Sequence, residues 1–318
     1  MNVGVTGGTG FVGQALVGRL LSRGASVRVL ARPSHRADAL ETQGAHVVRG
    51  DLVDAEAAAR AFAGADVVYH LAAKVEGAGG RKEYFAANVT GTERLLQACL
   101  ANAVKRVVYA SSVAVYGPLR ATEPIDEDTP FDSAPEERDI YAQSKIAADR
   151  LALDFGRKTG LAITILRPGI IFGPGRPLPI GLLGARFGKS GIVVGTRNQR
   201  IPLVYIENLV DAMEAVAAES DVAPQQYIVV DDENLTLGEY HAARNAVENT
   251  HTLFVPPRPF ALAADCGLLP RAGTFSRRHV RRALENRKYD TSRIRLQTGW
   301  APKIDLREAI RRTVARSA

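Results

Sequence analysis

The feature that most constrains the fold of this chain is the stretch TGGTGFVG at residues 6–13, which lies between an apolar run and a helical run. Its glycines Gly7, Gly10 and Gly13 recur at intervals of three. Such a triplet occurs by chance in many chains, so alone it indicates only a tight turn. If a parallel strand precedes it and a helix follows it, however, the same turn holds the phosphates of a dinucleotide.

The segments after this turn alternate between strand-like and helix-like patterns. We expect strands at 2–6, 26–31, 46–50, 66–72, 105–111 and 162–168, with helices between them that include 83–102 and 140–160. Strands this apolar are typical of a parallel sheet covered on both faces. The pattern predicts an α/β protein with a doubly wound parallel (Rossmann) sheet and a smaller α/β substrate-binding lobe. In that fold Gly7 permits the sharp turn, Gly10 lets phosphate approach the backbone and Gly13 lets the helix pack on the strand.

The length of 318 residues, 46% of them hydrophobic, allows one large domain or two joined domains. We predict a dinucleotide-binding domain over residues 1–167 and a mainly substrate-binding lobe over 168–318. A segment near 196–215 is expected to cross back toward the first domain.

Composition excludes several classes of protein. Cys99 and Cys266 are too few and too far apart for a metal cluster or a disulfide framework, so we expect no metal and a cytoplasmic location. We expect no signal peptide and no transmembrane segment, because no apolar run approaches the roughly 20 residues that span a bilayer. The net charge of +7 is concentrated in residues 271–318, as solvated helix faces or as an anion-binding region. Nucleic acid is not an expected partner, because no aromatic residues are interleaved with the basic ones.

The ends of the second and third strands bear on the cofactor. The second strand ends at Arg32, with no acidic residue before Asp38, and this favours NADP over NAD, although an arginine there is often only a surface charge. The third strand ends near Asp51, which could bond the adenine amino group or equally cap the next helix.

The residues that could perform chemistry follow the fifth strand. Ser112 lies at its carboxyl end, and the stretch YAQSK puts Tyr141 and Lys145 four residues apart on one helix face. An ammonium group beside a phenol favours the phenolate, so Tyr141 could exchange a proton with a substrate hydroxyl. Ser112 would bond the same oxygen, and Lys145 would also bind the nicotinamide ribose. Such a pair alone is common on surfaces, but after a nucleotide-binding fold it is specific.

Over nearly its whole length the chain resembles the extended short-chain dehydrogenase/reductase superfamily, which includes nucleotide-sugar epimerases and dehydratases. The shared motifs are TGGTGFVG, GDL, YHLAA, NVTGT, SSVAVYG, YAQSK, LRPGIIFGPG and YDTSRIRLQTGWAP. The resemblance implies Ser112, Tyr141 and Lys145 as the catalytic set, with Ser112 preferred to Ser111 because it stands four residues before Tyr116. It implies cofactor contacts from Gly7, Gly10, Phe11, Val12, Asp51, Leu52, Ala72, Ala73, Pro168, Ile170 and Ile171. Asn88 matches a family asparagine that could equally tie a helix to a strand.

The resemblance also implies a homodimer formed by the helices at 83–102 and 140–159, although their apolar faces could equally pack on the sheet. Sugar-nucleotide members carry an arginine for the diphosphate where this chain has Ile201, and Arg200 is displaced by one position. The stretch YIEN instead resembles hydroxysteroid dehydrogenases and dihydroflavonol reductases. FGPG and the basic final segment with Arg282 suit an anionic sugar nucleotide.

We therefore expect an NAD(P)-dependent oxidoreductase that acts on a secondary alcohol or ketone of a small ring substrate, with contacts from Tyr116, Arg200 and Arg282. The alternative is a nucleotide-sugar epimerase that recycles its NAD internally. A dehydratase ranks lower, because SSVAVYG offers no acid/base pair beside the serine. A non-catalytic nucleotide sensor is disfavoured, because Tyr141 and Lys145 are both present.

Overall fold

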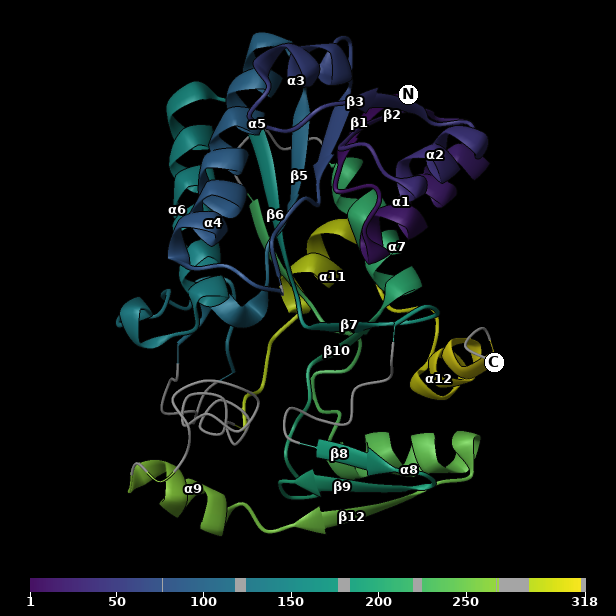
Figure 1. The fold of residues 1–318 in the computed structure, drawn as a ribbon, viewed down its shortest axis with the longest axis vertical. Helices are drawn as coiled ribbons and strands as arrows, with labels where there is room; N and C mark the ends of the chain where they lie inside the picture. Colours follow the sequence, from purple (N-terminus) through teal and green to yellow (C-terminus); the bar gives the residue numbers. More distant parts are fainter. Residues whose placement is uncertain are drawn as a thin grey trace.

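The alternation of strands and helices is present in the computed structural model of the chain (Figure 1). The structure describes residues 1–318 apart from 76, 118–123, 177–183, 220–224, 267, 269–285 and 316–318. The strands of the large sheet are β1 (Asn2–Thr6), β2 (Ser26–Ala31), β3 (His46–Arg49), β4 (Val67–His70), β5 (Arg106–Ala110), β6 (Ala162–Pro168) and β11 (Gln225–Val229). Their order is β11-β6-β5-β4-β1-β2-β3, and all neighbours are parallel. The expected doubly wound α/β fold is confirmed.

Strand β11 comes from the second half of the chain and was not expected from the sequence. It pairs with β6, with Tyr227 beside Leu166 in the register. Helix α7 (Ile206–Ala217) precedes it and packs on α1 (Phe11–Ser22). The second half therefore completes the same sheet that holds the glycine turn.

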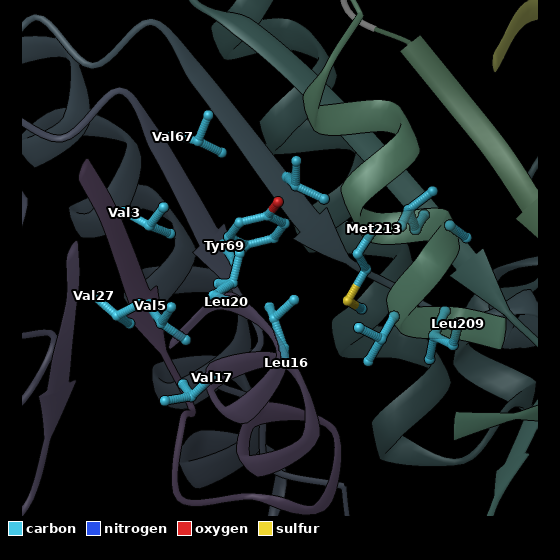
Figure 2. Packing of buried hydrophobic residues seen from close by; sticks show 14 of the residues in the cluster. Val3, Val5, Leu16, Val17, Leu20, Val27, Val67, Tyr69, Leu209 and Met213 are labelled. Atoms are coloured by element: carbon cyan, nitrogen blue, oxygen red, sulfur yellow. The ribbon is translucent and has the colours of Figure 1, made fainter. Parts of the chain in front are cut away.

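Helices cover both faces of this sheet. On one face lie α1, α2 (His35–Thr42) and α7, and on the other lie α3 (Ala55–Phe62), α5 (Gly91–Ala101) and α6 (Ile140–Thr159) (Figure 1). Figure 2 shows the first of these layers, in which Leu16 and Leu20 of α1 lie between Val5 of β1 and Met213 of α7. Each such buried side chain contributes about 1.5–3 kcal/mol of hydrophobic free energy.

The helix expected over residues 83–102 is interrupted. It consists of α4 (Arg81–Phe85), a π-helical turn over Ala86–Thr90, and α5. A π-helical turn changes the facing of the residues after it and is frequent at functional sites. This turn contains Asn88, whose contacts are described below.

The smaller region carries two short sheets (lower half of Figure 1). One pairs β7 (Ile170–Phe172) with β10 (Leu203–Tyr205), and the other has the order β12-β9-β8, formed by β8 (Gly184–Phe187), β9 (Ser190–Val194) and β12 (His251–Val255). The accompanying helices are α8 (Leu237–Glu248), α9 (Arg258–Asp265), α11 (Ser292–Thr298) and α12 (Leu306–Ala315). Helices α8 and α12 pack together through Tyr240 and Ile310, and α11 contacts β11.

In the described part of the chain, no helix has both the length and the apolar character that crossing a bilayer requires. Within the same residues, no group of three His, Cys, Asp or Glu side chains is arranged to hold a metal ion. Cys99 is buried and Cys266 is exposed, and neither forms a disulfide. Burial raises the pKa of the Cys99 thiol far above its usual value, so this thiol is an inert core group.

Candidate active site

The glycine turn joins β1 to α1 at the carboxyl edge of the large sheet. Gly7 has φ +71°, in the left-handed region that favours glycine, and a Cβ there would lie 2.6 Å from the backbone nitrogen of Ala72. A Cβ on Gly13 would lie 2.1 Å from the carbonyl oxygen of Gly7. The N–H of Gly10 donates to that same oxygen at 2.9 Å. Side chains at Gly7 and Gly13 would therefore push the turn away from β4 and α1 away from the turn.

Helix α1 begins with backbone N–H groups that no side chain caps. Gly10 occupies the cap position, and the first turn contains no acidic residue. The first N–H groups of a helix lack intrahelical partners and carry partial positive charge, so they attract an anion. Phe11 and Val12, in the first turn, are half-buried against the core of the smaller region. The open turn and uncapped helix fit the pyrophosphate of a dinucleotide.

Arg32 and Asp51 follow the neighbouring strands β2 and β3. Arg32 is 82% exposed and Asp51 49% exposed, and Nε of Arg32 lies 4.0 Å from Oδ2 of Asp51. An exposed pair at this distance contributes little to stability, so the guanidinium is accessible to an added anion. Leu52, the next residue, is half-buried against the core of the α3–α5 layer.

The other predicted cofactor positions lie on segments that leave this edge of the sheet. Ala72 and Ala73 follow β4 and are half-buried. Pro168 is the last residue of β6 and is buried, whereas Ile170 and Ile171 in β7 are half-buried. The structure thus assigns all these positions to one edge, which is where ligands bind in open parallel sheets.

His70 ties the elements behind the glycine turn together. Its Nδ1 lies 2.8 Å from the Thr6 hydroxyl, and its Nε2 lies 2.9 Å from the Thr92 hydroxyl. Burial lowers the pKa of His70 to about 3, so the ring is neutral at physiological pH. It cannot serve as a proton donor there, and it instead joins β1, β4 and α5.

Helix α6 holds Tyr141 in its first turn and Lys145 one turn later. The carboxylate of Asp139 caps this helix by accepting from the N–H of Ala142 at 2.8 Å. Lys145 is buried, and its Nζ donates to the carbonyl oxygen of Ala110 at 2.8 Å. The cap and this anchor hold the ammonium group against the end of β5.

Burial lowers the pKa of Lys145 to about 8, and the nearby carboxylate of Asp149 opposes that shift. The ammonium form therefore predominates at pH 7 and is lost above pH 8. The Tyr109 hydroxyl lies 3.3 Å from Nζ of Lys145. Burial raises the pKa of Tyr109, and the charges of Asp149 and Tyr141 add to that effect. Tyr141 and Lys145 therefore both lie close enough to Tyr109 to interact with its hydroxyl electrostatically.

The two serines after β5 differ in their surroundings. Ser111 is buried and its hydroxyl donates to Oδ1 of Asp149 at 2.5 Å. Ser112 is half-buried, and its oxygen accepts from the N–H of Ala114 at 3.1 Å, which caps the 3-10 turn Val113–Val115. A serine that accepts one bond still has its own O–H to donate. Ser112 can therefore donate its O–H to a ligand, whereas the O–H of Ser111 is used by Asp149.

A buried ion pair extends this cluster. Asp149, one turn beyond Lys145 on α6, is fully buried and its Oδ2 lies 3.0 Å from Nε of Arg167 on β6. Arg167 also donates from Nη1 to the Tyr116 hydroxyl at 2.7 Å. Tyr116 itself has no exposed surface. Its hydroxyl is thus held inside the protein by Arg167, whereas we expected from the sequence a tyrosine that contacts the substrate.

Asn88 links the π-helical turn to α6. Its amide donates to the Ser144 hydroxyl at 2.8 Å and to the carbonyl oxygen of Lys74 at 3.0 Å, and its oxygen accepts from the N–H of Lys74 at 2.7 Å. Ser144 in turn donates to the carbonyl oxygen of Tyr141 at 2.7 Å. Asn88 therefore fixes the first turn of α6, where Tyr141 lies, relative to the segment that leaves β4.

A cavity with a volume of about 70 Å³ opens beside this cluster. Val113 and Ala114, which directly follow Ser112, form one wall, and Ile170 forms another. Arg200 also lines it, as does Arg287, which was not expected from the sequence. Arg282 lies outside the described residues.

A buried carboxyl group at the end of β11 should make the stability of the fold depend on pH. Asp231 follows β11, and its Oδ2 accepts from the N–H of Tyr205 at 2.8 Å while its Oδ1 is buried. Burial raises the pKa of Asp231 to about 7. The folded state favours the neutral carboxyl, so this group increases the free energy of unfolding. The full increase is present below about pH 4 and is lost as the pH rises to about 7.

We expect Asp231→Asn to gain stability relative to the wild type between pH 4 and pH 7, by on the order of 3 kcal/mol. Denaturant unfolding at several pH values measures this difference. Asp232→Asn is the matched control, since Asp232 is exposed and caps a turn by accepting from Asn234. A difference between the Asp231→Asn variant and wild type that does not change with pH would contradict the prediction.

Comparisons with known proteins agree on one family. Residues 3–230 match the model of the NAD dependent epimerase/dehydratase family. The 2-alkyl-3-oxoalkanoate reductase of Stenotrophomonas maltophilia is 35% identical over 247 residues, which cover 75% of this chain and 73% of that protein. The Shewanella oneidensis protein of the same name is 32% identical over 74% of this chain, and the match spans 63% of its own length.

Three further proteins match nearly the whole of this chain. The 3beta-hydroxysteroid-dehydrogenase/decarboxylase isoform 1 of Arabidopsis thaliana is 28% identical over 98% of this chain and 78% of that protein. Among solved structures, the protein gox2253 superposes with a TM-score of 0.81 at 25% identity, covering 99% of this chain and 97% of its own. MoeE5, solved with UDP-glucose and NAD, has a TM-score of 0.76 at 24% identity over 100% of this chain and 98% of that chain, and supports the fold.

Proposed function

Because this chain belongs to the NAD-dependent epimerase/dehydratase family of extended short-chain dehydrogenases/reductases, we propose that it is an NAD(P)-dependent oxidoreductase acting on a secondary alcohol or ketone. The names of the relatives support this, since they are reductases of oxoalkanoates and dehydrogenases of hydroxysteroids. The bound nicotinamide would supply or accept the hydride. Side chains of this chain would transfer the proton and orient the substrate.

One observation carries the proposal, and it is the position of Lys145. A buried ammonium group, held by the Ala110 carbonyl at 2.8 Å, lies one helical turn from Tyr141. Moving such a charge out of water costs free energy, so buried charges occur mainly at functional sites or beside a charged partner. A positive charge here favours the phenolate form of Tyr141.

Three side chains share the proton chemistry in this proposal. Tyr141 gives a proton to the carbonyl oxygen during reduction, or takes one from the hydroxyl during oxidation. Ser112 donates its O–H to the same oxygen and so orients it. Lys145 stabilises the phenolate and binds the ribose next to the nicotinamide. The cofactor contacts of Gly7, Gly10, Phe11, Val12, Asp51, Leu52, Ala72, Ala73, Pro168, Ile170 and Ile171 are proposed with them.

We propose NADP as the preferred cofactor because of Arg32. Its exposed guanidinium, at the end of β2, suits the 2′-phosphate that distinguishes NADP from NAD. Arg32→Ala should therefore raise KM for NADPH about 10-fold or more and leave KM for NADH within about 2-fold. Steady-state kinetics with both cofactors measure this. Arg60→Ala, which removes an exposed arginine on α3, is the control, and an equal loss with both cofactors would count against NADP preference.

The second candidate function is a nucleotide-sugar epimerase that recycles its NAD. The solved structures with UDP-sugars support it at the level of the fold. The two functions are separated by the fate of the cofactor. A steady change in NAD(P)H absorbance with an alcohol or ketone substrate supports the oxidoreductase. Product formed from UDP-glucose without net cofactor turnover supports the epimerase instead.

Two further expectations stay predictions. A homodimer through the helices at 83–102 and 140–159 is implied by the family resemblance alone. The cytoplasmic location is expected from the cysteine content. The substrate is a small molecule in both candidate functions.

A further inference from the structure

The cavity beside Ser112 combines apolar walls with guanidinium groups. Its apolar lining includes Ile170, Ile201 and Leu237. Ile201 and Leu237 are also members of the buried core of the smaller region, so these walls are fixed by packing. Walls of this kind suit the hydrocarbon part of a small organic substrate.

Arg200 lines this cavity and carries an unsatisfied donor. The residue is half-buried, and its backbone is held by a hydrogen bond from its N–H to Oδ1 of Asn286 at 2.8 Å. Its Nε is buried and has no hydrogen-bond partner in the described part of the chain. A buried donor without a partner costs about 1–3 kcal/mol, which an acceptor on a ligand would recover.

Arg287 contributes a second guanidinium at a fixed position. Its Nη1 donates to the carbonyl oxygen of Tyr116 at 3.1 Å, four residues after Ser112. Its neighbour Tyr289 is buried and also lines the cavity. The second positive charge is therefore anchored to the segment that carries Ser112.

We propose that Arg200 and Arg287 form a carboxylate clamp, so that the substrate is an apolar secondary alcohol or ketone that also carries one carboxylate. This rests on the proposed function, because the same cavity reaches Val113 and Ile170 beside the proposed reacting centre. A planar guanidinium matches a carboxylate in shape and charge and can bind it through two parallel hydrogen bonds. The acid group is held by the arginines while the hydrocarbon lies on the apolar walls.

The lining favours one carboxylate over a sugar diphosphate. A nucleotide sugar carries many hydroxyl and amide groups, each of which must be hydrogen-bonded when it leaves water. Besides the two arginines, the described lining offers the polar side chains of Gln199 and Tyr289. Ile201, at the position where sugar-nucleotide members carry an arginine, is 3% exposed and packs in the core.

The test compares 3-hydroxydecanoate with its methyl ester, which has the same reacting carbon and lacks the charge. The wild type should oxidise the acid with a KM about 10- to 100-fold below that for the ester. Arg200→Gln should raise KM for the acid by about the same factor and leave the ester within about 2-fold. Arg197→Gln is the matched control, because Arg197 is exposed three residues earlier and contacts the Phe254 ring.

Binding of decanoate, which cannot react, tests the clamp without turnover. Calorimetry on the NADP-loaded protein should give binding that Arg200→Gln weakens and Arg197→Gln does not. That result supports the clamp even if neither alcohol is oxidised, in which case the proposed oxidoreductase activity fails alone. The clamp is overturned if the wild type has the same KM for acid and ester, or if Arg200→Gln raises both KM values equally. It is also overturned if UDP-glucose displaces decanoate and this displacement requires Arg200.

Discussion

Replacing Tyr141 by phenylalanine should lower kcat by about 100- to 10,000-fold while cofactor affinity stays within about 2-fold. The substitution removes one oxygen and leaves the ring on α6 in place. General acid–base catalysis by a positioned side chain contributes about this factor. The cofactor cradle at the glycine turn is formed by β1, α1 and β4, which this change does not touch. Initial rates from NADPH absorbance and cofactor titration by fluorescence measure the two quantities separately.

The matched control for this prediction is Tyr240→Phe. Tyr240 is fully buried and lies on α8, in the core of the smaller region. Its loss should change stability and leave kcat nearly unaltered. If Tyr141→Phe kept its rate, or if both variants lost activity to the same extent, Tyr141 would not be the proton donor.

Much of the fold could be predicted because its strands are apolar and its helices are amphipathic. The glycine turn, the six alternating strands and the family membership that we expected from the motifs are all confirmed. Strand β11 was missed because QQYIV is short, half polar, and far in sequence from β6, its partner. The π-helical turn was missed because one extra residue within a turn scarcely changes the hydrophobic pattern of a 20-residue helix.

The candidate site could be predicted where its residues lie close together in sequence. Tyr141 and Lys145 share a helix face, so their spacing was informative. Asp149 continues the same face one turn further, and an acid on an otherwise buried face was a signal that could have been used. Its partner Arg167 could not be predicted, because it lies 18 residues away on β6 and only the fold brings the two charges together. Arg287 was hidden among the many arginines of the basic final segment.

The ion pair between Asp149 and Arg167 should be the most sensitive pair for stability. Asp149→Leu leaves the Arg167 charge buried without compensation, which costs about 3–5 kcal/mol. Because replacing both partners of a buried pair by apolar groups is often neutral, Asp149→Leu/Arg167→Met should recover most of that loss. Urea unfolding of the single and double variants gives the coupling free energy. Asp154→Leu on the same helix breaks an exposed pair with Arg157 and should cost little.

The double variant also separates stability from catalysis, because Asp149 acts on Lys145. Its carboxylate opposes the shift that burial imposes on the pKa of Lys145, which is about 8. Without Asp149 that pKa falls further, so the ammonium form is lost at a lower pH. If the rate requires this ammonium, the falling limb of kcat/KM against pH should move to lower pH in the folded double variant. An unchanged limb in a stable double variant would show that Asp149 and Arg167 serve the fold alone.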